Sequence, residues 1–259
     1  MQTLILAAAA NVVLGALLGA VGGLLGIGGG LIAIPVLGYL YGFDQHLAQG
    51  TALVMIAANV VVGVWRYHQR HRIDVRAVGT MSLFSMAATW GAAKFASRVG
   101  ADSLQVAFAV FLILLAGYFG FDALRSRTSK APATEAPPLP LPQSVLPVLG
   151  MVSGAMSGFF TIGGGLVIVP ALVSLLRMEQ IRAQGMALAL VVPSSIIALL
   201  TYGQEGHVAW STGLPLALGG VLSVSWGVRL AHRLPALRLR ILFCLVLLAT
   251  AGMMLSERM

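Results

Sequence analysis

The chain has 259 residues, of which 58% are hydrophobic and only 9% are charged. Soluble domains carry about 25% charged residues, so this composition excludes an ordinary soluble protein and predicts one built for lipid. The net charge of +8 does not indicate a nucleic-acid partner, because most Lys and Arg lie in short loops between apolar runs. The single cysteine, Cys244, excludes an intrachain disulfide and a multi-cysteine metal site.

Apolar runs recur along the whole chain and predict two sets of five helical segments. In the first set these are residues 9–25, 31–41, 46–65, 77–93 and 104–121. A stretch with five prolines follows, which predicts a flexible linker over 122–143. The second set covers residues 145–160, 166–176, 183–201, 211–228 and 239–255. We therefore expect a first transmembrane repeat over 1–121, a cytoplasmic linker over 122–143, and a second repeat over 144–259.

A glycine block marks the same place in both sets. It reads GIGGGLIAIP at 26–35 and TIGGGLVIVP at 161–170, an offset of 135 positions. At the same offset, Ala48-Gln49-Gly50 recurs as Ala183-Gln184-Gly185, and three glycines spaced by four recur upstream. These glycines are Gly15, Gly19 and Gly23 in one copy, and Gly150, Gly154 and Gly158 in the other. The chain is a duplicated unit, and the spaced glycines predict close helix packing.

The second arm of each glycine-broken segment is about 11 residues long, which spans about 16 Å and therefore only half of a bilayer core. Each segment is either a hairpin that re-enters on the same side or one long crossing. With hairpins, 13 of the 16 Lys and Arg fall on one side of the membrane, whereas single crossings divide them evenly. Because cytoplasmic loops are rich in Lys and Arg, the charge pattern favours hairpins, with both termini outside.

Each half then makes three net crossings, so the second half is upside down relative to the first. The predicted fold is all-α transmembrane, an inverted repeat of two halves, each a glycine-tipped re-entrant helical hairpin plus three membrane-spanning helices. Inverted repeats of this kind are common among secondary transporters, whose broken helices meet near the middle of the membrane.

The glycine tips are the first candidate binding site. Each tip precedes a new helix, whose free N–H groups and positive dipole end attract anions. Missing side chains let a ligand approach the backbone, although the same glycines also permit tight turning alone. The predicted contacts with substrate are Ile27, Gly28, Gly29, Gly30, Thr161, Ile162, Gly163, Gly164 and Gly165.

Polar residues inside the spans are weaker candidates. Asn59 aligns with Ser194, and Ser195 follows it; all three serve either the substrate path or helix packing. Gln49 and Gln184 are repeated at helix starts, where they line the pathway or clamp the hairpins. The aligned tyrosines at positions 67 and 202 are expected to be anchors at the membrane interface.

The repeated G-I-G-G-G-L-x-x-x-P type of block, followed by the A-Q-G segment at the next helix start, resembles the sulfite exporter family TauE/SafE over both halves. The resemblance implies a multi-helix membrane permease for small anionic sulfur compounds, such as sulfite or sulfonates including sulfoacetate. We expect the protein to reside in a bacterial-type cytoplasmic (inner) membrane and to hold neither a cofactor nor a bound metal.

Other function classes stay open at this point. A permease for a different small anion or for a metal cation fits the same architecture, as does a membrane-embedded binding subunit that transports nothing. An intramembrane enzyme using Ser194 or Ser195 is disfavoured, because no histidine or acid lies at a comparable depth. The expected partners are a small sulfur anion and the lipid bilayer but no nucleic acid, and a homodimer is open.

Overall fold

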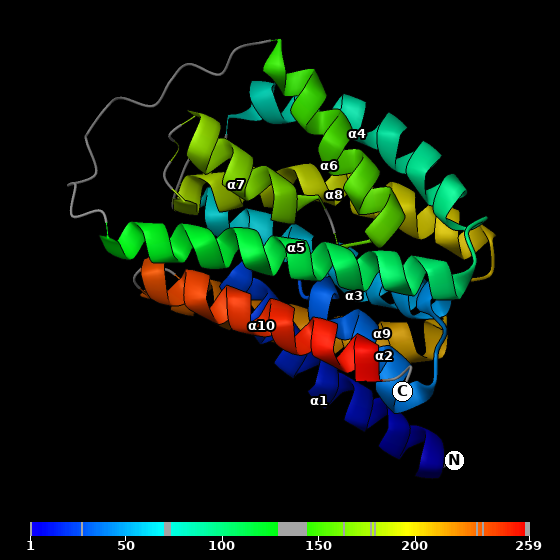
Figure 1. Cartoon of the computed structure of the whole chain (residues 1–259). Coiled ribbons are helices and arrows are strands. Elements are labelled where there is room, and N and C mark those ends of the chain that lie inside the picture. The colour runs from blue at the N-terminus through cyan, green and yellow to red at the C-terminus, as the bar shows by residue number, and fades with distance from the viewer. Residues whose placement is uncertain are drawn as a thin grey trace.

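The computed structural model describes residues 2–26, 28–69, 74–128, 144–162, 164–176, 178, 180–231, 233–234 and 236–256. Helices make up nearly all of this part of the chain (Figure 1). They are α1 Gln2–Leu25, α2 Gly30–Tyr41, α3 Gln45–His68, α4 Val75–Ala96, α5 Ala101–Thr128, α6 Val145–Phe160, α7 Gly165–Leu176, α8 Gln180–Gln204, α9 Trp210–Ala231 and α10 Ala236–Ser256. The prediction of an all-α transmembrane protein is confirmed.

Local signals explain where several helices begin and end. Asp44 caps α3 by accepting a hydrogen bond from the backbone N–H of Leu47 at 2.8 Å, and Asp74 caps α4 in the same way. Gly42 ends α2 in the left-handed conformation, with φ of 64°. By contrast, residues 122–128 contain no glycine or proline, and α5 continues to Thr128. The helix thus enters the predicted linker, of which residues 129–143 lie outside the described residues.

The first glycine block lies at the turn of a helical hairpin. The hydroxyl of Tyr41, at the end of α2, donates to the side-chain oxygen of Asn11 in α1. At the turn, Gly29 lies against the backbone of Leu18, so α2 runs back along α1. α1 is longer than predicted, because it begins at Gln2. From Asn11 to its end at Leu25, the α1 arm of the hairpin has 15 residues and is about 22 Å long.

The long helices of the two halves exchange partners. Gly15, Gly19 and Gly23 of α1 lie against Leu216, Gly220 and Val224 of α9, in register and in the same direction. The equivalent glycines of α6, at positions 150, 154 and 158, lie against Met81, Ser85 and Thr89 of α4. Each half therefore contributes the helix that covers the glycine face of the other, and close backbone approach holds both contacts together.

α3 and α8 form the centre of the molecule and run antiparallel to one another. Gly63 near the end of α3 faces Leu188 near the start of α8, while the start of α3 is bonded to the end of α8. α3 and α8 occupy equivalent positions in the two halves of the repeat, and they point in opposite directions. In Figure 1, α1 begins and α10 ends at the right of the view, whereas α5 ends at the left.

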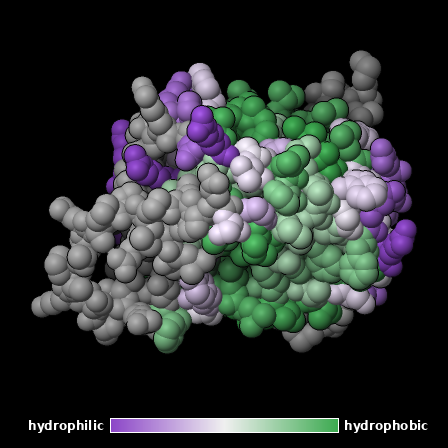
Figure 2. Space-filling model, turned by 90° about the horizontal axis from the view of Figure 1, so that it is seen from above, coloured by the Kyte–Doolittle hydropathy of each residue, from purple (hydrophilic) through white to green (hydrophobic). Residues whose placement is uncertain are grey.

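The outer surface has the character of a membrane protein. Figure 2 shows a broad hydrophobic region between hydrophilic groups at either end. Five helices of the described chain are long and apolar enough to cross a bilayer, within Leu6–Leu25, Gln45–His68, Ala101–Phe121, Arg182–Gln204 and Trp210–Ala231. α4, a predicted span, has the length but is not among the five. Its polar residues, such as Ser85 and Thr89, are buried against α6 and lower its hydropathy.

Candidate functional site

The two glycine blocks lie next to one another in the interior. The position that a Cβ would occupy on Gly30 is 3.7 Å from the carbonyl oxygen of Thr161. Both blocks lead into a helix, α2 at Gly30 and α7 at Gly165, and the first N–H groups of a helix have no acceptor within it. Two helix starts thus converge on one region. Ile27 and Gly163, also predicted contacts, lie outside the described residues.

The entry to each block has the same unusual backbone conformation. Gly26 has φ of 71°, and its counterpart Thr161 has φ of 57°. Thr161 is the only residue besides glycine with positive φ in the described part of the chain. A threonine in this conformation is strained, and its hydroxyl, which donates to the carbonyl of Phe160 at 2.7 Å, is turned toward its own backbone. Ile162, the next predicted contact, is buried.

Asn59 joins the first glycine block to the central helix α3. Its side-chain nitrogen Nδ2 donates to the carbonyl oxygen of Gly28 at 3.1 Å, in a fully buried position. The side-chain oxygen Oδ1 has no hydrogen-bond partner among the described residues. Asn59 therefore fixes the tip and leaves a buried acceptor beside it.

The two serines that align with this region make their hydrogen bonds within their own helix. Ser194 donates to the carbonyl of Leu190 at 2.9 Å, and Ser195 donates to that of Val192 at 2.9 Å, both within their own helix α8. Hydroxyls that return to the preceding turn compete with the helix ladder and are a common way to satisfy a serine in lipid. Asn59 and its sequence counterpart Ser194 therefore differ in their hydrogen bonds: the side chain of Asn59 bonds to a glycine block, and that of Ser194 bonds to its own helix.

The repeated glutamines are bonded to the repeated tyrosines, across the two halves. Tyr202 in α8 donates to the Oε1 atom of Gln49 in α3 at 2.8 Å. Tyr67 in α3 donates to the Oε1 atom of Gln184 in α8 at 3.2 Å. Both tyrosines are only 1% exposed, so the prediction that they anchor the chain at the membrane surface is wrong. Their hydroxyls are satisfied by an amide rather than by water.

The two glutamines differ in the surroundings of their side chains. The side chain of Gln184 packs against Gly26, with its Cγ 3.3 Å from the position of an added Cβ. The Nε2 atom of Gln49 is fully buried and has no hydrogen-bond partner among the described residues. A buried donor without an acceptor destabilises a fold by about 1–3 kcal/mol. Such a group is expected at a position that a ligand occupies.

A stacked pair of histidines lies at the end where α3 begins, and the sequence analysis missed it. The rings of His46 and His207 are 4.9 Å apart between centroids, and Nε2 of His46 is 2.9 Å from the carbonyl oxygen of Val99. The two residues are 161 positions apart, and the counterpart of His46 is Ile181. No repeat or spacing signal could therefore have identified the pair.

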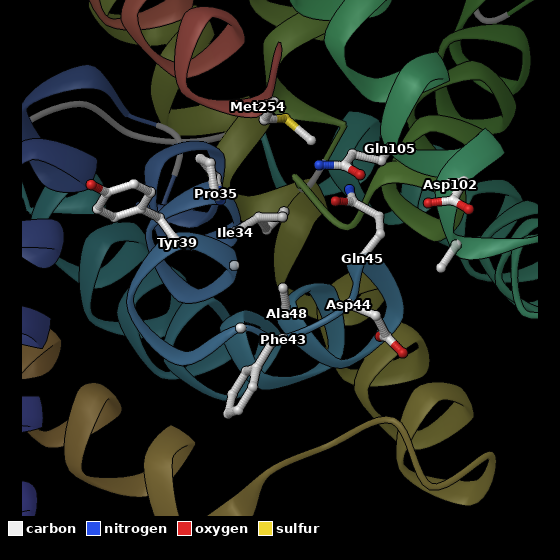
Figure 3. Close-up of a pocket in the computed structure, with 13 residues that line it drawn as sticks. Ile34, Pro35, Tyr39, Phe43, Asp44, Gln45, Ala48, Asp102, Gln105 and Met254 are labelled. Atoms are coloured by element: carbon white, nitrogen blue, oxygen red, sulfur yellow. The ribbon is translucent and has the colours of Figure 1, made fainter. Parts of the chain in front are cut away.

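A cavity of about 340 Å³ opens at the same end, between α2, the starts of α3 and α5, and Met254 of α10 (Figure 3). Gln45 and Gln105 extend into it in Figure 3, and its lining also includes the acidic residues Asp44 and Asp102. Its thirteen lining residues include no Lys or Arg. The cavity therefore differs in charge from the glycine region and lacks the character of an anion site.

The buried polar side chains have a common chemistry. Among the described residues they belong to Asn, Gln, Ser, Thr and one His, together with the hydroxyls of Tyr67 and Tyr202, with no buried Asp, Glu, Lys or Arg. No group of three or more His, Cys, Asp or Glu side chains suited to a metal ion occurs in that part of the chain. The interior around the two tips thus offers neutral amide and hydroxyl groups together with backbone N–H groups.

Two adjacent glycines allow a matched test of the second tip. We expect Gly164→Ala to lower the melting temperature strongly, because the added Cβ would overlap the backbone of Ser153 in α6, with its Cα at 2.5 Å. Gly165→Ala should leave the melting temperature within a few degrees of the wild type, because its Cβ meets only Ala187 and Val191 at 3.6 Å. Thermal unfolding of both purified variants decides the matter, and equal stability would show that α7 does not return against α6.

The helices and the paired tips define an integral membrane protein with a polar, glycine-lined centre, which is the class of membrane transporters. A model of the sulfite exporter TauE/SafE family matches residues 11–254. The chain belongs to this family, as the resemblance of its glycine blocks predicts.

Curated relatives support the same class. A probable membrane transporter protein of Xylella fastidiosa (strain Temecula1) is 31% identical over 253 residues, which cover 92% of this chain and 90% of the relative. A probable membrane transporter protein of Methanocaldococcus jannaschii is 25% identical and covers 91% of both chains. One of Bacillus subtilis, 24% identical, covers 95% of this chain and 96% of the relative. No solved structure matches the chain. By its family and by its relatives, the protein is a membrane transporter.

Proposed function

We propose that the protein transports small sulfur-containing oxyanions, sulfite or an organosulfonate such as sulfoacetate, and that the substrate binds between the two glycine tips. The observation that carries this proposal is the convergence of two helix starts in an interior without any buried charged side chain among the described residues. Backbone donors and positive dipole ends stabilise anions and repel cations. The family description, sulfite exporter, supports the same substrate class.

The proposed site consists of the glycine tips with Thr161 and Ile162, the amides of Gln49, Gln184 and Asn59, and the hydroxyls of Ser194 and Ser195. An oxyanion with three or four oxygens offers several acceptors to several N–H groups at once. Charge-assisted hydrogen bonds are the strong kind, each contributing about 1.5–3 kcal/mol before desolvation is subtracted. A singly charged sulfonate is easier to strip of water than doubly charged sulfate, so we propose selectivity against sulfate.

The arrangement of the helices supports a transport cycle by alternating access. α3 and α8 are sequence counterparts that run antiparallel, as an inverted repeat requires. In the proposed topology the first hairpin enters from outside and the second from the cytoplasm, and the Arg-rich loops face the cytoplasm. Rocking of one half against the other would then expose the tips to each side in turn.

Flux through liposomes that contain only this protein tests the proposal. We expect uptake of sulfite or sulfoacetate, at least about tenfold less uptake of sulfate, and none of Ni²⁺ or Co²⁺. The same anions should raise the melting temperature of the purified protein, because a ligand that binds only the folded state stabilises it. Flux of a metal cation with no response to any anion would refute the proposal, as would the lack of any flux.

A further inference from the structure

Two equivalent hydrogen bonds tie the central helices α3 and α8 together. The Tyr202–Gln49 and Tyr67–Gln184 bonds have the same chemistry, the same direction of donation and the same 135-residue offset. In both, the tyrosine belongs to one half and the glutamine to the other. The two glutamines lie at opposite ends of the antiparallel pair, near the start of α3 and the start of α8.

The direction of the bond decides what each glutamine can offer. A glutamine amide is both an acceptor and a donor, and it can turn to present either end. A hydroxyl that donates to Oε1 occupies the acceptor end and so directs the Nε2 donor away from the tyrosine. Gln49 shows the result directly, because its buried Nε2 has no partner among the described residues. Gln184 shows where such an amide lies, because its side chain packs against Gly26 at the first glycine block.

We propose that Tyr67 and Tyr202 are positioning residues for substrate: each hydroxyl holds a glutamine of the other half so that its amide presents only hydrogen-bond donors to a small oxyanion. This inference rests on the proposed function. It adds a mechanism: fixing the orientation of two neutral amides makes them favour a negatively charged ligand. An amide free to turn could equally present its oxygen to a cation or to the hydrogen of a water molecule. These tyrosine–glutamine hydrogen bonds also explain why two tyrosines near the ends of their helices are buried rather than exposed.

Substitutions at Gln49 separate this role from a merely structural clamp between helices. Gln49→Glu keeps the acceptor for the Tyr202 hydroxyl but removes the NH₂ group, whereas Gln49→Met removes both. If the residue only clamps α3 to α8, Gln49→Glu transports normally and Gln49→Met does not. If the residue binds substrate, both variants raise the KM for sulfite by at least about tenfold, a change that corresponds to about 1.4 kcal/mol.

The tyrosines are tested by removing the hydroxyl alone. We expect Tyr202→Phe and Tyr67→Phe to raise the KM for sulfite about fivefold or more while changing the maximal rate less, because the amide turns but remains in place. Tyr118→Phe is the matched control, since this tyrosine lies on α5 and is 48% exposed. Flux is measured with the full chain in liposomes, with sulfite as the probe and sulfoacetate as a second anion.

The possible results distinguish the two proposals. If the wild-type protein moves neither anion, the proposed function fails and the positioning role falls with it. If the wild type moves sulfite but Gln49→Glu has the wild-type KM, only the positioning role is overturned. Should Tyr202→Phe fail to fold, Gln49→Glu still decides, because it keeps an acceptor for the Tyr202 hydroxyl. A raised KM in Gln49→Glu together with a normal melting temperature supports the proposal.

Discussion

Replacing Gly19 by leucine is expected to lower the yield of folded protein by more than about tenfold, because the two helices it separates touch through their backbones. The position of an added Cβ on Gly19 is 2.5 Å from the Cα of Gly220 and 2.6 Å from its carbonyl oxygen. Backbone atoms of α9 cannot turn aside as a side chain can. α1 and α9 would have to move apart along their whole contact. Size-exclusion chromatography in detergent measures the folded fraction.

The control for this variant is Gly117→Leu, which adds the same apolar side chain to α5, where nothing lies within 4 Å of the added Cβ. It should fold at wild-type yield. Gly154→Leu tests the equivalent contact in the other half, because its Cβ position is 2.7 Å from the Cα of Ser85 in α4. A monodisperse Gly19→Leu protein with an unchanged melting temperature would contradict the packing of α1 on α9.

Replacing Asn59 by leucine is expected to reduce anion flux by at least about tenfold while the protein still reaches the membrane. The side-chain bond to Gly28 is what holds the first tip against α3. Leucine has a similar size but no donor, so the buried carbonyl loses its partner, with an expected cost of about 1–3 kcal/mol in stability. The tip would then turn away from its place in the proposed binding site.

Flux and thermal unfolding are measured together for this variant. Thr201→Val is the matched control, because Thr201 is also buried in a central helix, but its hydroxyl donates at 2.9 Å to Ile197 in its own helix α8. That variant should keep its flux. Normal flux in Asn59→Leu would show that the bond to Gly28 has no part in transport.

The apolar runs and the internal repeat of the sequence predicted most of the fold. The apolar runs predicted every helix, because a chain in lipid must satisfy its backbone internally and so leaves few alternatives to a helix. The ends of helices were harder to predict. α5 passes Phe121 into the expected linker, since charged residues such as Asp122 and Arg125 weaken the apolar signal without ending a helix.

The candidate site was predictable only where its residues are repeated. Gln49 and Gln184 were found through the offset, but their tyrosine partners were assigned to the membrane surface, because a tyrosine at the end of a span normally lies there. The contacts that join α3 to α8 are made by side chains more than 100 positions apart. The His46–His207 pair illustrates the same limit, since neither its spacing nor its surroundings in the sequence single it out.

The exchange of helices between the halves sets an order of events during synthesis. Gly154 meets Ser85, which was made only 69 positions earlier, so α6 finds its partner α4 as soon as it enters the membrane. Gly19 meets Gly220, which is made 201 positions later. α1 therefore waits in the lipid with its glycine face uncovered while seven further helices are inserted. The glycine face of α1 is covered only once α9 has been made, so a chain that stops before α9 leaves α1 without this partner.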